Sequence, residues 1–581
     1  MRLKVTKSKN AASLYVIKST YENKVNSSKI VEKLGTEKEL REKLGGKDPY
    51  EWAKEYIAEL NKKEKENKQE VLIKYAPHKL INKDEQLSFN CGYLFLQDIY
   101  HKLGLHKICS QMQERYKATF CLDAILSRLV YSRILFPASK RATYDLSKNF
   151  LETPCFEEHH IYRSLEIFAK EMDFIQASLY QNKQKAYPAN SRILFYDCTN
   201  FFFSIEQEDD FRKYGRSKDN QPSPLVQMGL FMDSDGIPLA IGMTPGNQNE
   251  QPTLKPLEKQ IIKDFKLSKI IVCTDAGLAS TENRKFNNIA RRSFVTTESI
   301  KKMKKEYQDW ALNMENWSFT GSKDFFNISD IQSDLENEKD QKKYLEKLNR
   351  IYYKERWRND DDLEQRMIVT YSPKYAQYQA KIRNRQLERA EKLIHSGEKK
   401  ITSKNQNDFR RFIASQSCTK NGEVAEQTTY FIDPDIVKNE SKYDGFYAVA
   451  TNLEDRVSEI IKINKGRWEI EENFRIMKSD FNSRPVYLQR EERIKAHFLT
   501  CFISLVLFRL LEKEFHNKYT VDEIITTLRN MRLHKVKGEG YLPSYTRNDL
   551  TDSLHEKHGF RTDYQIITNK EIKKILKKTK T

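Results

Sequence analysis

A series of short apolar runs beginning at residue 192 is the feature that most limits how this chain can fold. Three runs come close together in the sequence, and Asp-Ser-Asp-Gly separates the second from the third, which predicts a hairpin. A helical stretch and two more apolar runs follow. Neighbouring strands followed by alternating helix and strand predict an α/β core, a mixed sheet flanked by helices. The predicted elements are strands at Arg192–Tyr196, Leu225–Met232 and Ile237–Met243, a helix at Thr253–Phe265, and strands at Lys269–Thr274 and Phe294–Thr297.

The rest of the chain differs from this core in its pattern. Residues 85–190 carry apolar residues at three- and four-residue spacing, which predicts helices. This basic region is a candidate DNA-binding module, but helical packing explains the pattern equally well. Residues 569–581 hold six lysines and one glutamate, which predicts a mobile tail. The predicted parts are a strand and charged-helix region (1–84, with exposed helix at Glu37–Gln69), the helical region (85–190), the first part of the core (191–300), a charged insertion (301–440), the continued core (441–535, with helices at Arg456–Phe481 and about Glu491–Phe515) and a basic tail (536–581).

Net charge indicates the kind of partner. The chain has 101 Lys and Arg against 82 Asp and Glu, a net charge of +19. Such a surplus favours a polyanion such as nucleic acid, although an ordinary cytosolic protein can also be basic. The longest apolar stretch, Phe498–Leu511, is interrupted by Arg509 and is shorter than the ~20 residues of a membrane-spanning helix. None of the eight cysteines forms a C-x-x-C pair, which argues against a zinc site and a disulfide scaffold.

Two aspartates directly follow predicted buried strands. Asp197 stands in the sequence FYDCTN and Asp275 in VCTDAGL. A carboxylate at the carboxyl end of a strand points into the crevice where α/β proteins bind ligands. Two such carboxylates on adjacent strands can hold a divalent cation such as Mg²⁺, which prefers oxygen ligands. The alternative is that each aspartate only caps the turn that follows it.

A stripe of polar residues marks one side of the predicted helix Arg456–Phe481. Asn464, Arg467, Glu471 and Lys478 fall within a sector about 60° wide at 3.6 residues per turn. The stripe borders the apolar face, so a glutamate there can ligate a metal while the cations bind phosphate. The alternative is an exposed Arg–Glu pair of little consequence.

These elements together resemble the catalytic blocks of DDE transposases from bacterial insertion sequences, in the subgroup with a YREK signature. Arg467, Glu471 and Lys478 stand at the Arg, Glu and Lys positions of that signature, whereas Asn464 stands at the Tyr position. The likeness continues through FRIMKSDFNSRPVY and IKAHFLTCFISLVL, and TPGNQNEQPTLKP resembles the segment between the first two blocks. It covers about residues 190–300 and 440–515.

The resemblance implies an RNase H-like core with an insertion before the helix that carries the glutamate. It implies that Asp197, Asp275 and Glu471 are both the catalytic and the metal-binding residues, with carboxylates about 5–8 Å apart around two Mg²⁺ or Mn²⁺ ions. It also implies that Arg467 and Lys478 hold DNA phosphates. Asn464 can hydrogen-bond a phosphate but cannot stack as a tyrosine does.

The resemblance also implies an activity and partners. The expected protein binds the terminal inverted repeats of an insertion sequence, cuts them with Mg²⁺, in some members through a hairpin, and joins them to target DNA. Pairing of two ends implies a dimer, and a bacterial source implies a cytoplasmic, nucleoid-associated location. Trp310 and Trp317 are candidates to stack on a flipped base.

Two other functions compete with this expectation. A DNA-binding protein of transposase descent without catalysis is the first, and it is supported by Asn464 alone. The second is an aspartyl phosphatase, which requires an acid two residues after the first, but position 199 is Thr.

Overall fold

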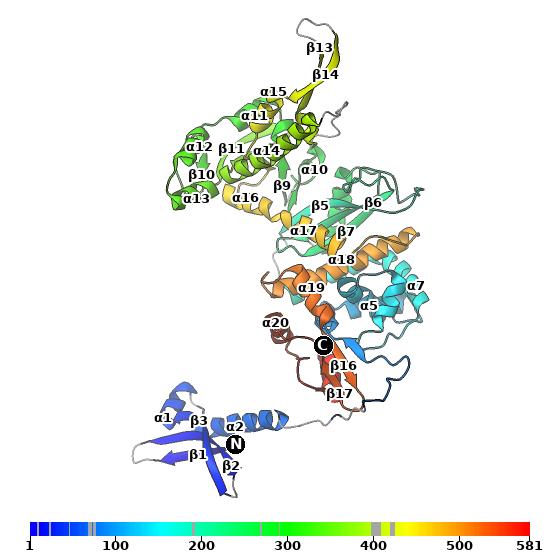
Figure 1. The fold of residues 1–581 in the computed structure, drawn as a ribbon, viewed down its shortest axis with the longest axis vertical. Helices are drawn as coiled ribbons and strands as arrows, with labels where there is room; N and C mark the ends of the chain where they lie inside the picture. The colour runs from blue at the N-terminus through cyan, green and yellow to red at the C-terminus, as the bar shows by residue number, and fades with distance from the viewer. Residues whose placement is uncertain are drawn as a thin grey trace. The chain divides into compact units, whose positions relative to one another are not determined.

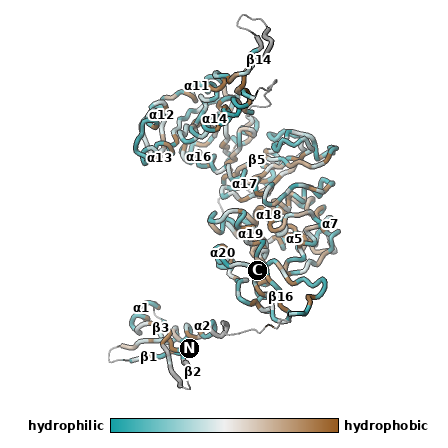
Figure 2. The backbone as a smooth tube through the Cα atoms, in the orientation of Figure 1, coloured by the Kyte–Doolittle hydropathy of each residue, from teal (hydrophilic) through white to brown (hydrophobic). Residues whose placement is uncertain are grey.

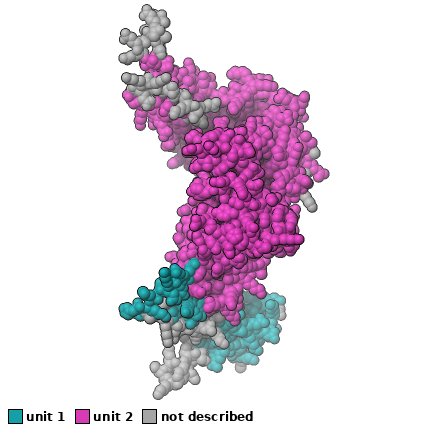
Figure 3. Space-filling view, turned by 90° about the vertical axis from the view of Figure 1, so that its right-hand side faces the viewer, with its two compact units in different colours: residues 1–86, 536–540 teal, residues 87–535, 541–581 magenta. Residues whose placement is uncertain are grey.

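The computed structural model divides the chain into two compact units. It describes all residues except 8–10, 23–24, 46, 68–72, 74–76, 189–191, 266, 268–269, 290, 397–407 and 419–423. Unit 1 comprises residues 1–86 and 536–540, and unit 2 comprises residues 87–535 and 541–581 (Figure 3).

Unit 1 is a small antiparallel sheet with two helices. Leu14, Leu40 and Ala53 form its buried centre. The predicted helix Glu37–Gln69 is two helices, because the chain turns at Gly45 with a φ of +54°. Residues 68–69 of that prediction lie outside the described residues. The elements are β1 (Arg2–Lys7), β2 (Ala12–Glu22), β3 (Val25–Thr36), α1 (Glu37–Lys43) and α2 (Pro49–Asn67).

A nine-stranded mixed sheet forms the centre of unit 2 (Figure 1). Its order is β10-β11-β12-β15-β9-β8-β5-β6-β7. Strands β5, β8 and β9 are parallel, and the β6–β7 hairpin turns at Gly236, whose φ is +76°. The predicted α/β core is therefore confirmed as a mixed sheet with flanking helices. The strands are β5 (Ile193–Phe202), β6 (Leu225–Asp233), β7 (Pro238–Pro245), β8 (Ile270–Thr274), β9 (Arg292–Glu298), β10 (Ser318–Phe319), β11 (Tyr352–Asp360), β12 (Leu363–Tyr371) and β15 (Phe446–Thr451).

Alternation along β5 divides its side chains between two layers of helices. Leu194, Tyr196 and Cys198 pack with α8 (Met172–Ala186) and α9 (Leu254–Phe265). Phe195 belongs to the other core, together with residues of α17 and α18. Asp197 has the same parity as Phe195 and so shares this second face. The helical segments of the second layer are α16 (Val457–Gly466), α17 (Trp468–Arg475), the π-helix η4 (Ile476–Asp480) and α18 (Glu491–Glu514), and the short η1 (Gln251–Thr253) and α10 (Thr281–Phe286) connect the core strands.

Residues 301–440 contribute both strands and helices. Strand β12 pairs with β15 from Arg366↔Thr451 to Tyr371↔Phe446, so this segment extends the central sheet. Its helices cover a separate apolar cluster around Trp317. The further elements are η2 (Ile300–Lys302), α11 (Lys305–Leu312), α12 (Ile328–Asn337), α13 (Gln341–Asn349), α14 (Pro373–His395), η3 (Phe409–Phe412), β13 (Ile413–Cys418), β14 (Val424–Ile432) and α15 (Pro434–Ser441).

The helical prediction for residues 85–190 is confirmed. Several of these helices pack against α18, whose central part, from Phe498 to Phe508, is buried and largely apolar (Figure 2). By length and composition α18 is also able to cross a membrane, but 94% of its apolar window is buried inside the protein, as in a core helix. The elements before α8 are β4 (Ser88–Asn90), α3 (Tyr93–Lys102), α4 (Leu105–Tyr116), α5 (Leu122–Leu135), α6 (Lys140–Ser147) and α7 (Glu158–Lys170).

The prediction of a mobile C-terminal tail is wrong. Thr568 and Glu571 form a capping box that starts α21, and Ile572 and Ile575 are buried. The lysines occupy the opposite face of this short amphipathic helix, so their number hid its apolar side. The C-terminal elements are α19 (Val521–Asn530), β16 (Arg532–Val536), β17 (Gly540–Pro543), α20 (Asp549–His558), β18 (Ile567–Thr568) and α21 (Asn569–Lys578).

Candidate active site

Asp197 and Asp275 lie side by side at one edge of the parallel strands. The parallel pairing of β5 with β8 ends at Phe195↔Cys273, so each aspartate stands two residues beyond the last pair. Adjacent strands are about 4.8 Å apart, which keeps the two side chains close. Asp275 directly follows β8, as expected. Asp197, however, lies inside β5 because the antiparallel pairing with β6 continues to Phe202, and the prediction that the strand ends before it is wrong.

The electrostatic state of Asp197 reflects this position. Burial, and then the charge of Asp275, raise the pKa of the Asp197 carboxyl to about 6. The positive charge of Lys218 acts to lower the same pKa. Both carboxylates also accept backbone hydrogen bonds: Asp197 Oδ1 from the Cys198 N–H at 2.7 Å, and Asp275 Oδ1 from the Leu278 N–H at 3.0 Å. The backbone thus orients two carboxylates whose charges repel each other.

Arg467 connects the third predicted acid to this pair. It lies at the junction of α16 and α17, and its Nη1 is 3.6 Å from Glu471 Oε1. Burial lowers the pKa of the Arg467 guanidinium, but nearby Tyr447, Asp197, Asp275 and Glu471 outweigh it and raise that pKa. Glu471 itself is 65% exposed and lies toward Arg467 and solvent.

Two other glutamates of α17 face elsewhere, as the helical stripe predicts. Glu469 forms ion pairs with Arg509 and, at 3.7 Å, with Lys513. Glu472 pairs with Arg475 at 2.7 Å. Glu471 is the acid of this helix that pairs with Arg467, and it acts on the Arg467 guanidinium together with the two aspartates.

Lys478 lies in the π-helix η4, which continues α17. Its Nζ is 3.5 Å from Asp219, and the ring of Phe201 is 5.5 Å away. Arg484 contacts the same carboxylate at 3.2 Å. Lys478 also acts electrostatically on Lys218, which places it at the edge of the site.

Asn464 contacts side chains of the sheet. Its Nδ2 donates a hydrogen bond to the Tyr447 hydroxyl at 3.1 Å, and its Oδ1 accepts one from Thr297 at 3.4 Å. The Tyr447 hydroxyl is also 2.6 Å from Thr297 Oγ1. Tyr447 also acts on the Arg467 guanidinium. The phenol of Tyr447 therefore lies beside Arg467, although the Tyr position of the signature holds Asn464.

The two predicted tryptophans differ in environment. Trp317 is fully buried, packs against Tyr371 and Phe446, and donates from Nε1 to the Asn313 carbonyl at 2.9 Å. Its assignment to DNA binding is wrong, because a core ring that fills a cluster is inaccessible to a base. Trp310 is half-buried and lies 4.9 Å from Lys354 Nζ.

Two functional candidates escaped the sequence analysis. Lys218 comes from the loop between β5 and β6, and its charge reaches Asp197. Its Nζ pairs with Glu250 at 3.0 Å. Glu250 stands within TPGNQNEQPTLKP, which offered a signal for it, whereas the loop around Lys218 matches no motif.

The donor set suits a hard divalent cation. Two carboxylates held side by side, one of them with a raised pKa, would be stabilised by positive charge between them. Another acidic group, Asp552, His555 and Asp563, has ligand atoms within 4.8 Å of one another. Arg561 already contacts both of its aspartates at 2.6 Å, so an internal cation balances that group.

Carboxylates that can hold a divalent cation therefore lie beside cationic side chains that can bind phosphate. The transposase DDE domain family model matches residues 190–507, more than half of the chain. The chain therefore belongs to the DDE transposase family.

Two of the solved structures that match this chain are described here. A synaptic complex of piggyBac transposase with hairpin DNA is 9% identical, with a TM-score of 0.33 over 84% of each chain. A Mos1 transposase paired-end complex with the left transposon end is 9% identical, with a TM-score of 0.13 over 39% of this chain and 62% of that one. No curated protein matches.

Proposed function

We propose that this transposase binds the terminal inverted repeats of a bacterial insertion sequence, cleaves them in a metal-dependent reaction and transfers them to target DNA. The observation that carries this proposal is that Asp197 and Asp275 lie side by side beyond the last parallel pair of β5 and β8, with the Arg467–Glu471 pair close to them. These acids come from β5, the end of β8 and α17, segments far apart in the sequence.

The order of the central strands supports an RNase H-like core. The hairpin β6–β7 lies on one side of β5, and the parallel strands β8 and β9 lie on the other. Residues 301–440 separate β9 from β15 and α16 in the chain, which fits an insertion before the glutamate-bearing helix.

Each site residue has a proposed role. Asp197, Asp275 and Glu471 would hold two Mg²⁺ or Mn²⁺ ions, for which Glu471 must turn from Arg467 toward the aspartates. When bound, such ions activate a water or a DNA 3′-hydroxyl and stabilise the leaving oxygen. Arg467 and Lys478 bind the phosphates on either side of the scissile bond.

Further contacts with DNA complete the proposal. Asn464 contributes a hydrogen bond to the DNA end, and Trp310 offers the remaining predicted ring for a flipped base in a hairpin intermediate. The helical region 85–190 binds the repeats, and two copies of the chain pair two ends. The protein acts at the bacterial nucleoid.

Cleavage of the native element ends tests this function. A labelled duplex carrying the inverted repeats that flank the coding region is incubated with protein and Mg²⁺. We expect cleavage by the wild type, and loss of cleavage with retained binding for Asp197→Asn, Asp275→Asn and Glu471→Gln. Glu472→Gln is the matched control, because this acid lies on the same helix but pairs with Arg475.

The possible results separate the two candidate functions. Binding by the wild type without any cleavage would favour the non-catalytic DNA-binding protein. Full cleavage by Glu471→Gln would remove Glu471 from the proposed triad.

A further inference from the structure

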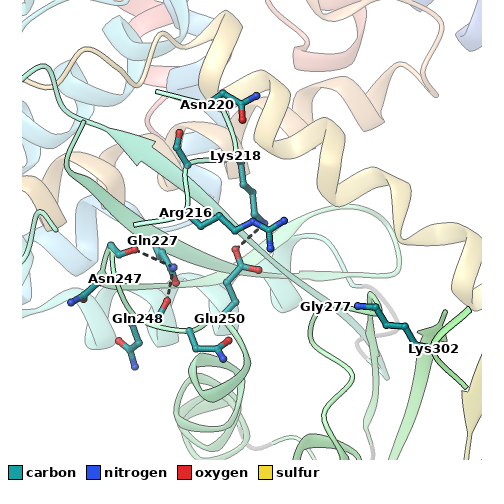
Figure 4. Close-up of a pocket in the computed structure, with 12 residues that line it drawn as sticks. Arg216, Lys218, Asn220, Gln227, Asn247, Gln248, Glu250, Gly277 and Lys302 are labelled. Carbon is teal, nitrogen blue, oxygen red and sulfur yellow. Dashed lines mark hydrogen bonds and ion pairs between the residues drawn. The ribbon is translucent and has the colours of Figure 1, made fainter. Parts of the chain in front are cut away.

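A pocket of about 1100 Å³ lies close to the paired aspartates. Figure 4 shows the side chains that line it. Lys218 lines it on one side and carries the charge that reaches Asp197. Gly277 lines it on the other, where a Cβ would lie 3.3 Å from Asp275 Oδ1. Lys218 and Gly277 therefore border both the pocket and the candidate active site.

Carboxamides are the largest group of side chains that line this pocket. Its other polar side chains are the cations Arg216, Lys218 and Lys302, the Glu250 carboxylate that pairs with Lys218, and the Ser217 hydroxyl, and the described lining contains no aromatic ring. Carboxamides carry both donors and acceptors and match the edges of bases, whereas a cation alone matches a phosphate. The amide residues are Asn220, Gln227, Asn247, Gln248 and Asn249.

Gln227 on β6 is the buried member of this set, with 6% of its surface exposed. Its Nε2 donates to the Gln248 carbonyl at 2.6 Å and to the Gly246 carbonyl at 3.5 Å. Its Oε1 is buried and has no hydrogen-bond partner among the described residues. A buried acceptor without a donor is costly, and this oxygen becomes available to a ligand N–H when the Gln227 side chain turns toward the pocket that it lines.

The loops around the pocket are held in place before any ligand binds. Buried Asn200, three residues after Asp197, donates to the Arg216 carbonyl at 3.0 Å and accepts from the Lys218 N–H at 3.2 Å. A Cβ on Gly215 would lie 2.1 Å from the Gly246 oxygen, so the two loops pack backbone against backbone. Such pre-organisation is what selective binding requires.

We infer that this pocket receives a base next to the scissile phosphate, and that Gln227 Oε1 accepts a hydrogen bond from its exocyclic amino group. The inference rests on the proposed function and adds sequence selectivity to it. Adenine, cytosine and guanine carry such an amino group and thymine does not, so the pocket disfavours thymine at that position.

The experiment uses full-length protein and a pool of duplexes with the native ends, randomised at three base pairs on each side of the cleavage point. Bound and unbound DNA are sequenced in the presence of EDTA. We expect the wild type to favour amino-bearing bases roughly 10-fold at one randomised position. Gln227→Leu and Asn247→Ala should flatten this preference, while Asn337→Ala, at the exposed end of α12, should keep it.

Several results would overturn the inference. One is a wild type without any preference, and another is a preference that persists in both pocket variants. Asn247 is exposed, so its variant decides the question if Gln227→Leu fails to fold. If Arg216→Ala and Lys302→Ala weaken binding equally for every sequence while no base preference exists, the pocket holds the DNA backbone instead. Failure of the wild type to cleave the native ends with Mg²⁺ would instead contradict the proposed function.

Discussion

The Asp197 carboxyl has a pKa raised to about 6 by burial and by the charge of Asp275, above its ordinary value of 3.8. The folded protein therefore holds a proton more tightly than the unfolded chain does. The resulting stability is fully present below about pH 4 and is lost as the pH rises through about 6. At neutral pH the two ionised aspartates destabilise the metal-free fold.

Asp197→Asn replaces the carboxyl with a neutral amide, so it should remove this loss of stability at neutral pH. We expect the metal-free variant to melt roughly 1–3 °C above the wild type at pH 7.5 and to match it near pH 4, as measured by calorimetry in EDTA. Mg²⁺ should raise the melting temperature of the wild type and leave that of the variant nearly unchanged. A variant that melts below the wild type at pH 7.5 would contradict the charge repulsion.

Residues differed in how far the sequence could predict them. Asp275 was predictable because it follows a short strand that is apolar except for its last residue, Thr274. The contacts of Asn464 were not, because Tyr447 and Thr297 come from strands that only the folded sheet brings beside the helix. Trp317 was misassigned because aromatic residues in a charged segment look the same in sequence whether they are core or surface.

At the scale of elements, the approach of α16 to the sheet positions the helix that carries Glu471, the third proposed site residue. Gly466 is the last residue of α16, and a Cβ there would lie 2.7 Å from Phe195 Cζ. Phe195 is buried in β5 two residues before Asp197, so its ring has little room to move. The helix that carries Arg467 and Glu471 therefore depends on this glycine.

Gly466→Ala should push α16 and α17 away from β5. Overpacking of this kind costs about 1–3 kcal/mol of unfolding free energy, which urea denaturation measures. Cleavage of the native ends should fall more than the folded fraction does, because Glu471 moves from the aspartates. Lys465→Ala, at an exposed neighbouring position, should leave the stability unchanged. Wild-type stability in Gly466→Ala would indicate that the contact is loose.

The contact between α9 and α10 contains a second carboxyl with a raised pKa. Burial raises the pKa of Glu258 to about 7. Asn287 Nδ2 donates to Glu258 Oε2 at 3.0 Å, while Glu258 Oε1 and Asn287 Oδ1 are both buried without hydrogen-bond partners among the described residues. A protonated Glu258 carries an O–H donor and no negative charge, so the neutral carboxyl is the form that suits this buried position.

Glu258→Gln should therefore stabilise the protein at high pH. In the wild type, the stability that comes from protonated Glu258 is present below the ordinary glutamate pKa of 4.5 and is lost as the pH rises through about 7, whereas a glutamine stays neutral at every pH. Urea denaturation at pH 5 and pH 8.5 should give a difference that favours the variant only at pH 8.5. An equal effect at both pH values would show that the side chain does not titrate as proposed.

At the scale of the whole molecule, sequence patterns predicted the elements better than their assembly. The periodicity identified the core strands and α18, but the nine-stranded order joins β12 to β15 across 74 residues of intervening sequence, from 372 to 445, which no local pattern encodes. The C-terminal tail was predicted wrongly for a related reason. The number of lysines describes only its composition, whereas the burial of Ile572 depends on what α21 packs against. The net charge, in contrast, is a sum over the residues and follows from the sequence without any structure.

That charge, +19 over the whole chain, predicts that DNA binding depends steeply on salt. Each neutralised phosphate releases counterions, so the logarithm of affinity falls linearly with the logarithm of salt concentration, with a slope of about −0.9 per phosphate contact. Lys478→Ala should remove one contact at the site and reduce the slope by about one, with a similar affinity loss for every DNA sequence.

Fluorescence anisotropy of a labelled end duplex between 50 and 300 mM KCl measures these slopes. Lys557→Ala removes an equal charge from an exposed position on α20 and is the matched control. Because net charge falls equally in both variants, a long-range field would change them alike, whereas a direct phosphate contact changes only Lys478→Ala. Equal salt slopes for the wild type and Lys478→Ala would place Lys478 outside the DNA interface. Its role would then be the ion pair with Asp219.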